Sequence, residues 1–137
     1  MKFLVPLFLT IIAFSNCEDL QVLVKNFEAK IRSLIDAKNF DGLAKYIHEH
    51  PKFWIAKIAP RDKQEIIDCL KNGTFILFNG VGPSDIPKIG FEEPSQTDSR
   101  IGVFRNMTDG REVDYKLRKQ NGTEFGYLIH DYIDYKA

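Results

Sequence analysis

The chain has 137 residues, with 19 Lys and Arg against 19 Asp and Glu, two Cys and one Trp, and 44% of its residues are hydrophobic. This composition is typical of one compact domain and excludes a disordered, collagen-like or disulfide-dense chain. A formal net charge of zero supplies no basic surface for nucleic acid, so we expect no nucleic-acid partner.

Residues 1–17 form a segment of their own. A single cation, Lys2, precedes an apolar run over residues 3–14, and this pattern is typical of a secretory signal peptide. The run is shorter than the roughly 20 apolar residues that a membrane-spanning helix needs. Small residues allow cleavage after Ser15 or after Cys17, and the sequence leaves both open. We therefore expect a secreted, extracellular protein with one domain over residues 18–137 and no membrane association after cleavage.

Three sequons for N-glycosylation begin at Asn72, Asn106 and Asn121, in agreement with an expected passage through the secretory pathway. Two of them contain Asn-Gly, which is also common in tight turns, and either interpretation predicts surface positions. If cleavage retains Cys17, it can form a disulfide with Cys69. If Cys17 is removed, Cys69 is a lone thiol, which more often packs as a small apolar residue than acts as a nucleophile.

The first half of the domain is predicted to be mainly helical. Apolar residues recur every three or four positions across residues 18–38, which is the stripe of an amphipathic helix. Asp41 is a candidate N-cap for a second, shorter helix, which Pro51 ends. A third helix is expected over residues 61–71, because Asn72-Gly73 supplies a C-terminal stop.

Strand-forming residues dominate the other segments. We predict short strands over residues 52–58 and 74–79, and an irregular excursion or interrupted strand over the Gly- and Pro-rich residues 80–99. A three-stranded antiparallel meander follows, with Asp-Gly and Asn-Gly turns, over residues 100–107, 111–119 and 123–135. Its charges of mixed sign predict a solvated sheet face: Glu112, Asp114, Lys116, Arg118 and Lys119.

The order of these elements resembles the nuclear transport factor 2-like superfamily. The resemblance rests on a long first helix, the turn over residues 36–43, the sequence Tyr46-Ile47-His48 at the end of a short helix, a strand, and the helix from residue 61. It implies a single-domain α+β fold in which N-terminal helices pack on a curved antiparallel sheet around an apolar pocket. Members include ketosteroid isomerase and polyketide cyclases, but a shared fold alone assigns no activity.

One acid is a candidate for catalysis. Strict alternation in the last strand places Asp131 in an apolar row with Tyr127 and Ile129. If that row lines the pocket, burial raises the pKa of Asp131 and makes it a general-base candidate, with Tyr115 or Tyr127 as hydrogen-bond donor. The alternative is a solvated Asp131, or one paired with a Lys or Arg.

The histidines give no site by themselves. His48 and His50 lack an evident third and fourth ligand, so we expect two exposed histidines at a helix end and no metal. A triad through His130 and Asp131 is rejected, because adjacent strand residues face opposite sides. No phosphate-binding or dinucleotide-binding motif is present, so we expect no cofactor.

We therefore expect a non-enzymatic binding protein whose pocket takes a small apolar ligand or a protein partner, with a homodimer as one form. One alternative is a pocket-based isomerase or cyclase that uses Asp131; another is a structural or interaction module that makes contacts through its sheet face. Most aromatic residues are expected in the core, and the surplus in a pocket: Phe53, Trp54, Phe75, Phe78, Phe104, Tyr115, Phe125 and Tyr127.

Overall fold

The computed structural model describes residues 4–55, 62–74, 77–78, 88–95, 98–106 and 112–134. Side chains are described in residues 20–55, 62–74, 77–78, 100–105 and 112–134. In chain order the elements are α1 (Leu4–Asp36), α2 (Phe40–Ala44), β1 (Ile47–Ile55), α3 (Lys63–Lys71), β2 (Lys88–Ser95), β3 (Asp98–Asn106), β4 (Glu112–Lys119) and β5 (Tyr127–Asp134).

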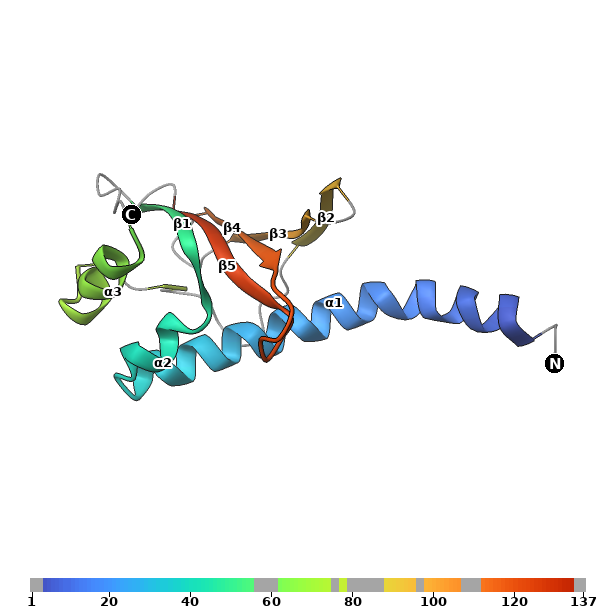
Figure 1. The fold of residues 1–137 in the computed structure, drawn as a ribbon, viewed down its shortest axis with the longest axis horizontal. Coiled ribbons are helices and arrows are strands. Elements are labelled where there is room, and N and C mark those ends of the chain that lie inside the picture. Colours follow the sequence, from blue (N-terminus) through green and yellow to red (C-terminus); the bar gives the residue numbers. More distant parts are fainter. Residues whose placement is uncertain are drawn as a thin grey trace.

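The strands form one curved sheet in the order β1-β5-β4-β3-β2 (Figure 1). The pairs β3–β4 and β4–β5 are antiparallel and confirm the expected three-stranded meander, and β2 adds a further antiparallel pair with β3. The first strand differs from the antiparallel expectation, because β1 pairs with β5 in parallel and makes the sheet mixed. No tight turn links these two strands, so the packing of their apolar residues, and not a hairpin, sets their direction.

Helix α1 lies across one face of the sheet, which we call the inner face (Figure 1). Its buried residues confirm the predicted stripe: Val24, Phe27, Ile31 and Leu34. Among the described side chains of α1, packing against the core begins at Leu20. The preceding turns extend away from the rest of the molecule (Figure 1). Within the described part of the chain, no helix has the length and apolar character needed to cross a membrane.

The helix expected from Asp41 to Pro51 is shorter than predicted. Asn39, not Asp41, is the N-cap, and its side chain accepts the Gly42 N–H at 2.9 Å. Strand β1 begins at Ile47 and includes Pro51. Ile47 is fully buried and lies beside Ile129 of β5, so burial in the sheet overrides the local helical pattern.

The remaining predicted segments can also be compared with the structure. Helix α3 is confirmed, with Asp62 as N-cap and Asn72 as C-cap. The strand expected over residues 74–79 is wrong in its described part, where Leu77 and Phe78 form a turn and Phe78 has a φ of 55°. Strand β2 lies within residues 80–99, where an interrupted strand was one alternative. The expected turn at residues 109–110 lies outside the described residues.

Candidate functional site

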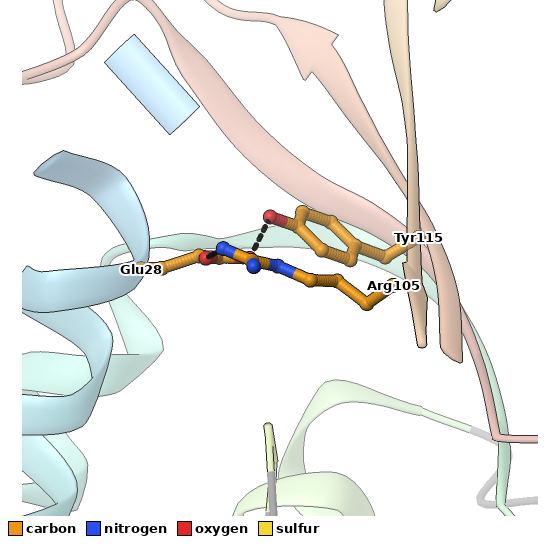
Figure 2. Close-up of polar contacts among 3 residues, drawn as sticks. All are labelled: Glu28, Arg105 and Tyr115. Carbon is orange, nitrogen blue, oxygen red and sulfur yellow. Dashed lines mark hydrogen bonds and ion pairs between the residues drawn. The ribbon is translucent and has the colours of Figure 1, made fainter. Parts of the chain in front are cut away.

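A buried ion pair joins α1 to the inner face of the sheet. Glu28 of α1 accepts a hydrogen bond from Arg105 Nε of β3 at 2.9 Å, and Arg105 Nη2 contacts its other carboxylate oxygen. Tyr115 of β4 donates its hydroxyl hydrogen to Glu28 Oε1 at 2.6 Å. The three side chains point toward one another from three elements (Figure 2), and none is more than 4% exposed. We call them the Glu28 triad.

The Glu28 triad is electrostatically matched. Burial raises the pKa of Tyr115 well above its ordinary value, and the nearby negative charge of Glu28 raises it further, whereas Arg105 acts against this shift. Tyr115 therefore remains a neutral donor, and the carboxylate receives hydrogen bonds from both partners. Glu28 and Arg105 were not among the site residues predicted from the sequence. The available signal was an acid inside an apolar helical stripe, between Phe27 and Ile31.

Aromatic rings pack beside the Glu28 triad. Phe53 and Tyr132 are stacked with ring centroids 5.5 Å apart, and Phe78 lies edge-on to Tyr115 at 5.2 Å and to Tyr132 at 5.7 Å. The Phe78 N–H donates to the Tyr132 hydroxyl at 2.8 Å, which fixes the turn in its left-handed conformation. In the described residues, side chains thus occupy the inner face where the resemblance implied an apolar pocket.

Asp131 does not lie on that inner face. Lys116 of β4 pairs with Asp131 but the next residue, Leu117, pairs with Ile129, so β5 carries one extra residue, His130. This bulge reverses the alternation: Ile129 and Tyr132 are fully buried in the core, and Asp131 faces outward. The prediction that Asp131 shares a row with Ile129 is therefore wrong.

The other two catalytic candidates are also placed apart from Asp131. The Tyr115 hydroxyl is held by Glu28 on the inner face. Tyr127 is half-buried at the start of β5 and packs against the core. Asp131 contacts its neighbour His130, through Nδ1 of the imidazole. The bulge also explains this contact, which strict alternation had excluded, because consecutive side chains in a bulge can lie toward the same side.

The three histidines of the chain meet at this bulge. The His48 ring lies 4.9 Å from His130 and 6.2 Å from His50, centroid to centroid. The sequence predicted His48 and His50 at a helix end, but the three histidines lie on two neighbouring strands. The irregularity of β1 between Ile47 and Lys52 brings His48 and His50 close to His130. Long-range pairing thus assembles a cluster that sequence spacing does not show.

The histidine cluster is not arranged as a metal centre. His48 Nδ1 accepts the His50 backbone N–H at 3.0 Å, so the one acceptor nitrogen of the neutral ring is already used. Among the described side chains, no group of three or more His, Cys, Asp or Glu residues is arranged to hold a metal ion.

We expect His48 to make stability pH-dependent. Burial lowers its pKa, and the nearby His130, Arg118 and His50 lower it further, whereas Glu49 acts in the opposite direction. Because folding depresses the pKa of a base, the unfolded chain takes up the proton first as pH falls below about 6.5, and stability is lost there. His48→Asn keeps an acceptor but does not titrate, so its stability should fall less than that of the wild type between pH 7.5 and 5 in urea unfolding.

The pH experiment has an internal control in His50, which is exposed on the same strand. His50 makes one of the smaller contributions to the lowered pKa of His48, so His50→Asn should change the pH dependence less than His48→Asn does. Equal pH profiles for the wild type and His48→Asn would contradict the assignment.

The outer face of the sheet, away from α1, carries two exposed aromatic residues. Trp54 of β1 is 62% exposed and Phe104 of β3 is 41% exposed, so neither belongs to the core, where most of the aromatic residues were expected. Register pairing places them in one row across four strands: Trp54, Ile133, Asp114 and Phe104. The adjacent row contains Lys52, Asp131 and Lys116. The mixed charges predicted for this face of the meander are half-buried or exposed.

The predicted glycosylation sites and the cysteines can be located in the described part of the chain. Asn72 and Asn121 are exposed, and the glycine after each has a φ of 70° and 84° respectively, as tight turns require. The side chain of Asn106 lies outside the described ones. Cys69 is a free, half-buried thiol that packs against the core, so the conditional bridge is not formed in this structure. The side chain of Cys17 also lies outside those described.

Solved structures share this fold at low sequence identity. Aln2 from a Streptomyces species is 16% identical, with 85% of this chain and 89% of that chain covered and a TM-score of 0.53. The S. rosetta CaMKII hub is 8% identical, with 83% and 94% covered and a TM-score of 0.55. A domain of unknown function with a cystatin-like fold from Nostoc punctiforme is 11% identical, with 81% and 73% covered and a TM-score of 0.50. No protein-family model and no curated protein sequence matches the chain.

Proposed function

Because this chain has the nuclear transport factor 2-like, cystatin-like α+β fold, we propose that it is a secreted, non-enzymatic module that pairs with a second copy of itself through the outer face of its sheet. The observation that carries this proposal is the row from Trp54 to Phe104, which leaves two large aromatic side chains in solvent. Exposed apolar groups gathered on one face commonly mark an interaction surface. One of the solved structures that share this fold is a hub domain, the S. rosetta CaMKII hub.

The outer face of one copy is complementary to the outer face of a second copy. A two-fold axis parallel to the strands, between β5 and β4, lays β1 over the partner's β3 and β5 over the partner's β4. Trp54 then meets the Phe104 position of the other copy, and Asp131 meets the Lys116 position. Each contact occurs twice, and opposite charges face each other at the centre. This match favours a second copy over an unrelated partner.

The size of the face suits a dimer. Four strands at about 4.8 Å spacing and eight residues at about 3.4 Å give a face of roughly 20 by 27 Å. The area of this face is of the same order of magnitude as the roughly 800 Å² per partner that a stable interface buries. Packed sheets keep their strand directions within about 30° of one another, which the two-fold arrangement allows.

A non-enzymatic role is supported by the positions of the candidate catalytic groups. The hydroxyl of Tyr115 and the carboxylate of Glu28 are bonded to each other on the inner face. Asp131 is on the outer face and contacts His130. The general base and the donor considered for an isomerase or cyclase therefore belong to different faces of the sheet.

Sedimentation velocity and tryptophan fluorescence test the dimer. Trp54 is the single tryptophan of the chain, so its emission should shift to the blue as micromolar protein is concentrated and the ring leaves water. Trp54→Glu should raise the dimer dissociation constant about 30-fold, since loss of an aromatic contact of about 1 kcal/mol at both of its symmetric positions costs about 2 kcal/mol.

A matched control exists on α1. Val22 is 56% exposed and lies away from the outer face, so Val22→Glu should leave the dissociation constant unchanged. A wild-type chain that stays monomeric at millimolar concentration, or a Val22→Glu variant as defective as Trp54→Glu, would contradict the proposal.

Secretion is supported by the N-terminal pattern of residues 1–17 and by the two exposed sequons. Expressed in a eukaryotic secretory host, the protein should leave the cell without the leader and carry glycans at Asn72 and Asn121. Endoglycosidase treatment should increase its gel mobility, and Asn72→Gln and Asn121→Gln should each remove one mobility step. Retention of the chain inside the cell, or mobility that the enzyme does not change, would contradict secretion.

A further inference from the structure

A groove lies outside the core where three parts of the chain meet. The end of α2 and the start of β1, the first turn of α3, and the connection between β4 and β5 enclose a volume of about 450 Å³. This volume is within the range of small-molecule sites. The groove is separate from the Glu28 triad and from the row of Trp54 and Phe104, because none of those residues lines it.

The floor of the groove is apolar. Ala44 of α2, Ile47 of β1 and Leu128 of β5 line it. Ala44 is half-buried and Leu128 is 8% exposed, so these two side chains provide the apolar surface that a ligand can reach, whereas Ile47 is fully buried behind them. A short hydrocarbon body placed on this floor would leave water without requiring the groove to rearrange.

The walls carry an excess of positive charge. Lys45 and Lys63 line the groove together with one acid, Glu49. Lys63 Nζ donates to Glu49 Oε1 at 2.9 Å, and this hydrogen bond lowers the pKa of Glu49. Glu49 is therefore already paired, and Lys45 adds a second ammonium group. The carboxylate of Glu124, in the neighbouring connection, accepts from the Tyr46 hydroxyl and is also committed.

His48 supplies a further donor to the groove that it lines. Its Nδ1 accepts the His50 backbone N–H at 3.0 Å, so the neutral ring carries its proton on Nε2. The ring is held between His130 and His50, and Arg118 lies close enough to influence its charge. An anion in the groove thus finds an N–H donor and a positive field from several elements.

We propose that this groove binds a small amphipathic organic anion, a carboxylate with a short hydrocarbon body that lies on Ala44 and Leu128 while its charged end meets Lys45, Lys63 and His48. The carboxylate competes with Glu49 for Lys63 and is favoured further when His48 takes up a proton. Affinity therefore increases as the hydrocarbon chain lengthens to fill the floor, and as pH falls from 7.5 to 6.

Hexanoate is the probe for this site, with hexanol and hexylammonium as comparators of the same length. The full-length mature protein is titrated at pH 6.5 while the imidazole signals of His48 are followed by NMR. Hexanoate should bind saturably in the low millimolar range or tighter, shift those signals and raise the pKa of His48. Acetate should bind at least tenfold more weakly, and the two comparators should not saturate.

Charge-matched variants complete the test. Lys45→Gln/Lys63→Gln should weaken hexanoate binding at least tenfold, whereas Lys25→Gln/Lys71→Gln, which removes two lysines that do not line the groove, should leave it unchanged. The proposal is overturned if hexanol binds as well as hexanoate, if acetate and hexanoate bind equally, or if both double variants behave alike. The result does not depend on self-association, because Trp54→Glu should bind hexanoate as the wild type does.

Discussion

Arg105→Met is expected to destabilise the protein by about 3–5 kcal/mol, because it leaves the buried carboxylate of Glu28 without its cation. Glu28 is 2% exposed and cannot regain water without moving α1 from the sheet. The Tyr115 hydroxyl remains as a donor, but one neutral hydrogen bond does not replace a guanidinium that contacts both carboxylate oxygens. Urea unfolding followed by circular dichroism measures the loss.

Removal of all three polar groups together should cost less than removal of Arg105 alone. Buried ion pairs are often replaced by apolar side chains of similar volume with little loss, since the desolvation cost disappears with the charges. We therefore expect Glu28→Met/Arg105→Met/Tyr115→Phe to be more stable than Arg105→Met. Lys25→Met, an exposed change on α1, should stay within about 0.5 kcal/mol of the wild type.

The outcome separates two roles for the Glu28 triad. If Arg105→Met unfolds at the wild-type urea concentration, the ion pair is not an anchor for α1. If the triple variant is at least as stable as the wild type, the charges add no stability and serve to fix the position of α1 on the sheet.

Charge exchange at the centre of the outer face should have the second large effect. In the two-fold arrangement, Asp131→Lys places the new lysine of each copy against Lys116 of the other copy. Lys116→Asp places the new aspartate of each copy against Asp131 of the other copy. Like charges brought together in an interface cost several kcal/mol, so each single variant should raise the dissociation constant by at least 100-fold.

The double variant is the decisive measurement. Asp131→Lys/Lys116→Asp restores opposite charges across the interface and should recover most of the affinity, as measured by sedimentation velocity. Mixing the two single variants should also give a heterodimer. If the double variant is as weak as either single one, the sheets do not pack in this register, even where Trp54→Glu shows that the face is used.

Some parts of the fold were predictable because local chemistry decides them. The apolar spacing from Val24 to Leu34 produced the inner stripe of α1, and Asn72-Gly73 ended α3 where expected. Asn121-Gly122 lies in a turn between β4 and β5 as predicted, but the connection runs to Gly126, so β5 begins at Tyr127 and not at the predicted residue 123. In each case a helix period, a cap or a turn acts over a few residues and needs no distant partner.

The sites depended on contacts between distant residues. The bulge at His130 inverts the faces of β5, so Asp131 moved outward although alternation placed it inward. Glu28 and Arg105 are 77 residues apart, and the sequence around each residue does not indicate that the two side chains form a pair. Residue type predicts that most aromatic side chains lie in the core, but only the pairing of β1 with β5 and of β3 with β4 decides which face Trp54 and Phe104 occupy.

The sequence by itself determined the balanced charge, the compact α+β character, the amphipathic first helix and the meander, because composition and short-range periodicity carry that information. The tertiary structure alone decided that β1 runs parallel to β5, that the three histidines meet, and that polar groups occupy the inner face. Strand pairing fixes side-chain direction residue by residue, and one extra residue in β5 is enough to reverse it.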